Sequence, residues 1–162
     1  MKHSILLKPY AEADAHFLAA IYFNTIHNIN CKDYSPEQIN AWAPKESVDT
    51  GRWIAKWKKL SPFVATINDK IVGFAEFEDN GHIDCFYCHH EYQGCGVGTT
   101  LLNHIESKAR KNKINKIFAE VSITAKPFFE AKGFTVTKEQ LVEIRGAKLT
   151  NFVMEKILHG DD

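Results

Sequence analysis

The chain has 162 residues, and its 20 basic and 20 acidic side chains give a formal net charge of zero at neutral pH. This length predicts one domain over residues 1–162, large enough to bury roughly 70% of the surface that the unfolded chain exposes. The balanced charge provides no field that would favour nucleic acid or an anionic membrane, so neither is expected as a partner. No apolar run approaches the ~20 residues of a membrane helix, and the N-terminal apolar run is too short for a signal peptide. A cytoplasmic protein is therefore expected.

The first half of the chain is predicted to be mainly helical. Apolar residues at helical spacing indicate helices, and Ser35, Pro36 and Gln38 have the arrangement of a capping box with proline at the first helical position. The expected elements are a strand over residues 5–8 and helices over residues 13–26, 36–43 and 48–60.

The second half is predicted to be rich in strands. Asn68-Asp69 and Asn80-Gly81 are typical of tight turns between paired strands. This order predicts an α/β protein with a central mixed sheet and helices on both faces. The expected elements are strands over residues 63–67, 71–77, 82–88, 117–121, 134–144 and 149–158, and helices over residues 99–111 and 125–132.

Four cysteines in a chain of this size indicate no disulfide framework. Cys85-x-x-Cys88 has the spacing of a redox or metal motif, but in a strand these two side chains point to opposite faces of the sheet. No second Cys-x-x-Cys or spaced histidine pair completes a zinc site. We therefore expect reduced, packed thiols and no metal. The alternative hypothesis of a redox protein depends on Cys85 and Cys88 alone.

The stretch Gln93-Gly94-Cys95-Gly96-Val97-Gly98 joins a predicted strand to an amphipathic helix beginning near Thr99. Glycine lets the backbone approach an anion closely, and the first N–H groups of a helix have no internal partner. A phosphorylated ligand is therefore expected here, with a plain tight turn as the alternative. A P-loop is excluded because no Lys-Ser/Thr pair follows the glycines, and the spacing does not fit dinucleotide binding.

The order Gln93-x-x-Gly96-x-Gly98 resembles the coenzyme A signature of the GNAT-type N-acetyltransferases. Downstream, Ala-Lys-Pro-Phe-Phe-Glu-Ala-Lys-Gly-Phe over residues 125–134 is similar to that family's A-x-x-F-Y-E-K-x-G-F landmark. The resemblance spans nearly the whole chain. It implies a GNAT-like fold with a splayed sheet, and an enzyme that transfers the acetyl group of acetyl-CoA to a primary amine of a small molecule or a protein.

The resemblance also implies where acetyl-CoA binds. Two parallel strands, over residues 82–88 and 117–121, would splay apart, and the pantetheine arm would pair with backbone groups of the first strand. The pyrophosphate would lie on the N–H groups of the glycine turn. Ser122 holds a position where the family often has a polar contact, although it could equally end the strand or cap the next helix. The expected cofactor-binding residues are Phe86, Tyr87, Cys88, Gln93, Gly94, Cys95, Gly96, Val97, Gly98, Thr99, Ser122 and Phe129.

A base or a water chain must remove a proton from the acceptor ammonium before the amine can attack the thioester. In some members of the family the base lies on the strand before the glycine turn, at positions that correspond to His82 and Asp84. These residues alternate onto one face of the strand, so both are expected to face the cleft. The ordinary pKa of imidazole near 6.5 places His82 first and Asp84 second. Glu76, on the neighbouring strand, is third. Polar residues at a solvated strand end are the alternative interpretation.

Phe129 stands where the family commonly has a tyrosine that protonates the departing thiolate. Phenylalanine cannot do so, although a thiol with a pKa of about 8–9 leaves tolerably well near neutrality. Water, Tyr87, Tyr92 or Cys88 could assist. We expect Phe129 to pack near the thioester, and a non-catalytic acyl-CoA-binding or sensing module is the alternative function.

The acceptor is expected across the cleft from the cofactor, against the first two helices. An aromatic wall would suit a cationic amine, and core packing explains the same residues equally well. Residues 34–44 also resemble a segment of one bacterial subgroup of these enzymes. The predicted hairpin over residues 134–158 could pair edge to edge with a second copy of the chain, so a homodimer is compatible with the sequence. The expected acceptor-side residues are Tyr22, His27, Tyr34, Trp42 and Glu76.

Overall fold

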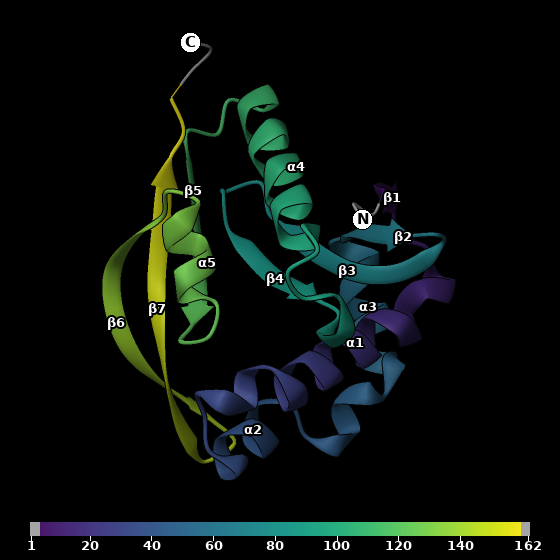
Figure 1. Ribbon diagram of the computed structural model, residues 1–162, viewed down its shortest axis with the longest axis vertical. Helices are drawn as coiled ribbons and strands as arrows, with labels where there is room; N and C mark the ends of the chain where they lie inside the picture. Colours follow the sequence, from purple (N-terminus) through teal and green to yellow (C-terminus); the bar gives the residue numbers. More distant parts are fainter. Residues whose placement is uncertain (1–3, 160–162) are drawn as a thin grey trace.

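Two antiparallel sheets form the centre of the molecule in the computed structural model, which describes residues 4–159 (Figure 1). In spatial order the first sheet contains β1 (Ile5–Pro9), β2 (Phe63–Ile67), β3 (Lys70–Phe77) and β4 (Ile83–Cys88). The second contains β5 (Lys116–Ser122), β7 (Ala147–Ile157) and β6 (Thr135–Ile144). The helices are α1 (Ala15–Asn28), α2 (Pro36–Trp42), α3 (Thr50–Lys59), α4 (Val97–Lys111) and α5 (Lys126–Ala131).

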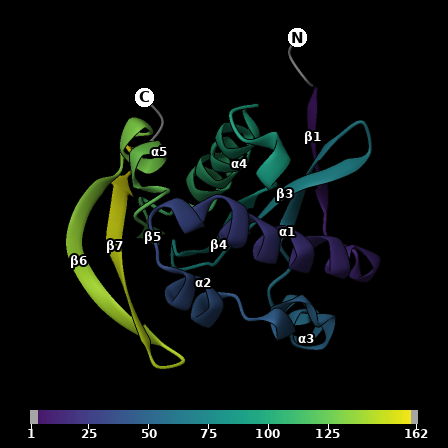
Figure 2. The same ribbon diagram turned by 60° about the horizontal axis from the view of Figure 1, so that its bottom comes forward.

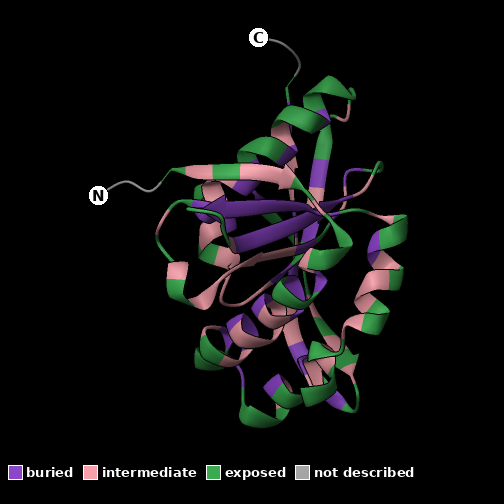
Figure 3. Ribbon diagram, turned by 90° about the vertical axis from the view of Figure 1, so that its right-hand side faces the viewer, coloured by how far each residue is buried: buried purple, intermediate pink, exposed green. Residues whose placement is uncertain are grey.

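Helices cover both faces of the first sheet, as the sequence predicts for an α/β protein (Figures 1 and 2). On one face α1 and α3 pack Leu18 and Trp57 against Phe74. On the other face α4 packs Leu101 and Ile105 into a second cluster. The strands β2 and β3 are buried along most of their length for this reason (Figure 3).

The two sheets meet where β4 approaches β5. Their described pairing is an isolated parallel bridge between His82 and Phe118, supported by a 3.0 Å hydrogen bond from the Phe118 N–H to the Gly81 carbonyl. A Cβ at Gly81 would lie 2.3 Å from the Lys116 carbonyl oxygen, so this approach requires glycine. Beyond the bridge the strands separate. The expected splay is confirmed, but the single mixed sheet is corrected to two antiparallel sheets joined at this bridge.

The predicted helices and strands are present in the structure, and they differ from the prediction in the residues at which they begin and end. The capping box is present, since Ser35 Oγ accepts from the Gln38 N–H at 3.1 Å and Gln38 Oε1 accepts from the Ser35 N–H at 2.8 Å. Helix α4 begins at Val97 rather than near Thr99 because Gly96, with φ of 91°, is its N-cap.

A buried charge cluster ties α3 to the first sheet. The side chain of Glu76 in β3 is fully buried, and Lys56 Nζ lies 3.1 Å from its Oε1 and 3.3 Å from its Oε2. Only the longer contact has hydrogen-bond geometry, so Oε1 is left with the ion pair alone. The same ammonium lies 3.0 Å from Asp84 Oδ2. Lys56 therefore compensates the charge of two carboxylates, the buried one of Glu76 and that of Asp84 in β4.

Replacing Lys56 by methionine leaves the Glu76 carboxylate buried without a counter-charge. We expect the free energy of unfolding, measured by urea denaturation, to fall by about 3 kcal/mol. Lys58→Met is the matched control, since Lys58 is exposed on the same helix and makes a 3.9 Å contact with Glu12. Adding Glu76→Gln to Lys56→Met should recover much of the loss. Equal losses for the Lys56 and Lys58 variants would contradict the assignment.

Candidate functional site

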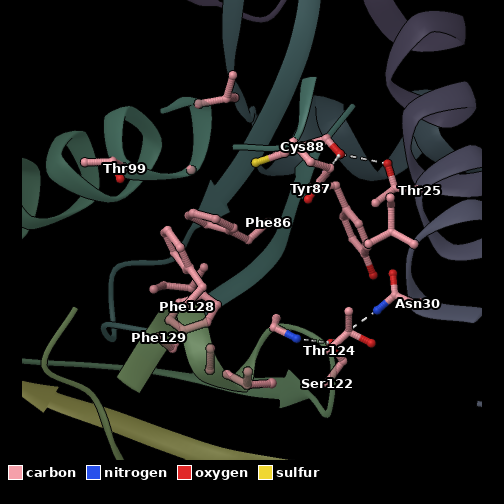
Figure 4. A pocket seen from close by; sticks show the side chains of 18 of the residues that line it. Thr25, Asn30, Phe86, Tyr87, Cys88, Thr99, Ser122, Thr124, Phe128 and Phe129 are labelled. Carbon is pink, nitrogen blue, oxygen red and sulfur yellow. Dashed lines mark hydrogen bonds between the residues drawn. The ribbon is translucent and has the colours of Figure 1, made fainter. Parts of the chain in front are cut away.

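A cleft of about 520 Å³ occupies the space where β4 and β5 separate (Figure 4). The glycine turn and the start of α4 line one end, and Phe128 and Phe129 of α5 line its floor. Residues of α1 and α2 line the opposite end. The cleft thus brings together segments from most of the chain.

The N-terminus of α4 opens into this cleft. Gly94 and Gly96 have φ of 74° and 91°, a region that side chains disfavour, and a Cβ at Gly94 would meet nothing within 4 Å. The N-cap residue Gly96 has no side chain with which to cap the helix, so the N–H groups of its first turn are available at the positive end of its dipole. A Cβ at Gly98 would come within 3.1 Å of the Phe128 ring, which explains the third glycine. This end of the cleft is suited to an anion.

The Gln93 side chain stabilises the glycine turn by hydrogen bonds to the backbone that precedes it. Its Nε2 donates to the Cys88 carbonyl at 2.9 Å and to the His89 carbonyl at 3.3 Å. The side chain therefore closes the connection between β4 and the helix. Cys95, also expected at the site, does not line the cleft and packs against the hydrophobic core instead.

One edge of β4 presents free backbone groups to the cleft. The His89 N–H donates to the Val72 carbonyl at 2.8 Å, so the backbone groups of Tyr87 and His89 face β3. Those of Phe86 and Cys88 alternate toward β5. The Cys88 carbonyl already accepts from Thr25 Oγ1 at 2.8 Å and from Gln93. Within the part of the chain that the structure describes, the polar groups of Phe86 and the Cys88 N–H remain for a ligand.

The β5 side of the cleft carries aromatic rings and the hydroxyl groups of Ser122 and Thr124. The Phe129 ring is 3% exposed and lies 5.3 Å from the Phe86 ring centroid. Ser122 Oγ accepts from the Ala125 N–H at 3.0 Å and from Asn30 Nδ2 at 3.3 Å, so Ser122 ends β5 and closes the turn that leads into α5. Thr124 Oγ1 is buried and has no hydrogen-bond partner among the described residues. No motif in the sequence pointed to Thr124, and its unsatisfied hydroxyl fits a polar ligand atom.

The expectation that His82 and Asp84 face one cleft is wrong. Asp84 lines the cleft, whereas His82 lies outside its lining. The register between β3 and β4 shifts near Ala75, and Ile83 and Phe86, three residues apart, both reach the same core. This irregularity breaks the strict alternation on which the prediction relied.

His82 instead lies between two carboxylates. Its Nδ1 contacts Glu78 Oε2, and its Nε2 lies 2.7 Å from Glu120 Oε2. Burial opposes the charged ring, but hydrogen bonding and attraction by Glu78 and Glu120 outweigh it and raise the pKa of His82. Glu120 lines the cleft and was missed by the sequence analysis, although it occupies a predicted strand at the splay.

The expected acceptor-side residues divide between two locations. Trp42 lines the main cleft and also a smaller cavity of about 140 Å³, which Tyr34 lines as well. Tyr22 lines neither cavity, because its hydroxyl donates to the Trp42 carbonyl at 3.2 Å within the core. His27 also lines neither, since its Nε2 contacts the Ala43 carbonyl at 2.7 Å. Glu76 is corrected to a buried partner of Lys56 on the α3 side of the sheet.

Two side chains considered as proton donors hold their protons tightly. Burial raises the pKa of Cys88 to about 12. Burial, followed by the proximity of Tyr22, raises the pKa of Tyr87 well above its usual range. Both line the cleft, and neither is prepared to donate a proton near neutrality.

A metal site and a membrane span were also sought. Within residues 4–159 no group of three or more histidine, cysteine or acidic side chains could hold a metal ion. Cys85 and Cys88 pack into different cores, as the strand period predicts. No helix in the same range is both long and apolar enough to cross a bilayer.

Comparison with known proteins decides the family. A family model described as an acetyltransferase (GNAT) domain matches residues 30–156. The chain is 37% identical to the uncharacterized N-acetyltransferase YafP of Escherichia coli K12, over 94% of this chain and 95% of that protein. The chain belongs to the GNAT acetyltransferase family. It is an N-acetyltransferase, and the sequence resemblance is confirmed.

Solved structures have the same fold. A GCN5-related N-acetyltransferase from Rhodopseudomonas palustris superposes with a TM-score of 0.91 at 34% identity, covering 98% of this chain and 99% of that one. The PaiA N-acetyltransferase of Thermoplasma acidophilum, solved with coenzyme A, has a TM-score of 0.74 at 20% identity, covering 95% and 99%. YncA of Salmonella typhimurium, solved with acetyl-CoA, has a TM-score of 0.71 at 21% identity, covering 97% and 95%.

The His82 contacts predict a specific pH dependence of stability. A group whose pKa is raised by folding stabilises fully below its unfolded pKa, about 6.5, and that contribution is lost as pH rises through the folded value. The destabilisation by His82→Gln should therefore be largest near pH 6 and shrink toward higher pH in urea denaturation. His104→Gln should show the opposite trend, because burial and Lys108 lower the pKa of His104. A pH-independent effect of His82→Gln would contradict the two contacts.

Proposed function

We propose that this chain, acting as one domain, transfers the acetyl group of acetyl-CoA directly to a primary amine of a small molecule or a protein. The observation that carries the proposal is the cleft between β4 and β5 with an uncapped helix N-terminus at its mouth. The Thermoplasma and Salmonella relatives by fold were solved with coenzyme A and acetyl-CoA, which supports the same ligand here.

The cleft offers a suitable partner for each part of acetyl-CoA. The diphosphate would lie on the N–H groups at the start of α4, where the glycines leave room. The peptide-like pantetheine arm would pair with the backbone of Phe86 and the Cys88 N–H as an added strand. The buried hydroxyl of Thr124 is available to a polar atom of the arm. The thioester would then reach the Phe86 and Phe129 rings.

The acceptor would approach from the end of the cleft lined by Trp42 and Tyr87. These aromatic side chains also line the smaller cavity, as do Glu120 and Asn151. Aromatic rings and a carboxylate favour a cationic amine over an anionic acceptor. Asp84 is paired with Lys56, so it is a less available base than the sequence analysis supposed.

A negative charge at the mouth of the cleft should repel the diphosphate. We expect Gly96→Glu to weaken acetyl-CoA binding at least about tenfold more than Gly96→Gln, measured by titration calorimetry. Both variants bear the same strain at positive φ, about 1–2 kcal/mol, so the comparison isolates the charge. Equal affinities of the two variants would remove the diphosphate from this turn.

Phe129 offers a direct test of thioester placement. Phe129→Tyr would set a hydroxyl in the floor of the cleft, where it can protonate the leaving thiolate, and we expect turnover to rise about tenfold. The assay follows free thiol release from acetyl-CoA with spermidine, tyramine, and peptides bearing a free N-terminus or a lysine. Phe134→Tyr is the control, because Phe134 is equally buried, packs on Phe129 and does not line the cleft. Unchanged turnover and unchanged affinity in Phe129→Tyr would place the thioester elsewhere.

A further inference from the structure

Glu120 lies where the cleft, the smaller cavity and the meeting point of the two sheets come together. We propose that Glu120 takes the proton from the acceptor amine, and that His82, anchored by Glu78, is the residue that positions the Glu120 carboxylate. This inference rests on the proposed acetyl transfer and assigns its proton acceptor. It replaces His82 and Asp84 in that role.

Glu120 is the more available of the two carboxylates in the cleft wall. Asp84 and Glu120 both line the cleft, but the Asp84 carboxylate lies 3.0 Å from Lys56 Nζ. Glu120 makes no ion pair with lysine or arginine within residues 4–159; its partner there is His82, which contacts Oε2 and leaves Oε1 for the amine, and the side chain is 46% exposed. It also lines the smaller cavity beside Trp42 and Tyr87, where the acceptor is expected. Glu120 can thus contact an ammonium group and pass a proton to solvent.

His82 holds this carboxylate through a hydrogen bond that requires a charged ring. Ionised carboxylates only accept hydrogen bonds, so an N–H must be present on both ring nitrogens for His82 to bond Glu78 and Glu120 together. A neutral ring can satisfy only one of them. The His82 backbone is fixed as well, because its N–H donates to Asn80 Oδ1 at 3.0 Å and the residue forms the bridge to Phe118.

Charged groups face His82 from the elements packed against it. Glu78 comes from the connection after β3, and Glu120 comes from β5. The Phe118 ring lies 5.1 Å from the imidazole. The nearby cation Lys116 lies over the Phe118 ring and pairs with Glu155 at 3.5 Å. The two carboxylates therefore dominate the surroundings of the ring.

The transfer balances with Glu120 as the first proton acceptor. The ammonium loses one proton to the Glu120 carboxylate, which releases it to solvent at its exposed edge. The neutral nitrogen then bonds to the thioester carbonyl carbon, and the carbon–sulfur bond breaks with its electron pair on sulfur. A second proton leaves the nitrogen and ends on that sulfur. The products are the N-acetylated amine, free thiol and one proton. Desolvation against the aromatic walls weakens the ammonium's hold on its first proton.

Activity measurements separate Glu120 from the other carboxylates. We expect Glu120→Gln to lower kcat/KM by about 100-fold or more with the best amine of the panel above, and to leave acetyl-CoA affinity unchanged. Asp84→Asn should lose much less. Glu139→Gln, on the exposed β6 strand, should match the unmodified protein. Full activity of Glu120→Gln, or a larger loss in Asp84→Asn, would overturn the assignment.

The positioning role of His82 has its own signature. Because Glu78 and Glu120 raise the pKa of His82, its charge is lost as pH rises through a value above the ordinary one. We therefore expect kcat/KM to fall on the alkaline side, and His82→Gln to remove that limb while keeping activity within about tenfold. In NMR titrations the pKa of the His82 ring should fall in Glu120→Gln. An unaltered ring pKa or a retained alkaline limb would overturn the positioning role.

The outcomes distinguish this inference from the proposed function. Absence of acetyl-CoA binding and of thiol release with every panel amine would refute the proposed function, whereas the NMR titration would still report on the Glu78–His82–Glu120 contacts. Normal turnover in Glu120→Gln would refute only the inference.

Discussion

The site depends on two sheets that touch at one end and separate at the other. Gly81 permits the approach to Lys116, and the His82–Phe118 bridge closes the contact. Past this bridge, β4 keeps β3 on one edge, and no strand within residues 4–159 pairs with its other edge. Free backbone N–H and C=O groups need partners, and a peptide-like ligand arm supplies them without any specific side chain. The same divergence leaves room for the aromatic floor and brings Glu120 to the cleft wall.

The two halves of the cleft are built by different means. The half proposed for the cofactor consists of backbone groups, glycines with positive φ and a helix terminus, so its chemistry is set by the fold. The half proposed for the acceptor uses side chains carried by separate elements, among them Trp42 of α2, Glu120 of β5 and Asn151 of β7. Substitutions there can change the acceptor without disturbing the sheet. This division explains why the sequence identifies an N-acetyltransferase family readily and the acceptor poorly.

Features defined by nearby residues were predictable from the sequence. The capping box at Ser35 and the glycine turn before α4 depend on local hydrogen bonding and φ preferences. The positions of the His82 and Asp84 side chains were not predictable, because a register shift between β3 and β4 breaks the alternation of side chains that the prediction assumed. Glu120 and Asn30 line the cleft and are held by hydrogen bonds to His82 and Ser122, which lie 38 and 92 positions away in the chain. Periodicity carries no information on such contacts, and it also could not tell that Glu76 faces the α3 side of the sheet.

The central claim is that a nucleotide diphosphate binds the N–H groups at the start of α4 while its thiol arm follows the free edge of β4. Amide NMR of the labelled protein during titration with coenzyme A tests it most directly. The account predicts that the largest shift changes fall on residues 94–99 and on Phe86 and Cys88, with little change at residues 135–141 of β6. Saturable binding with its largest changes outside the cleft would contradict the account.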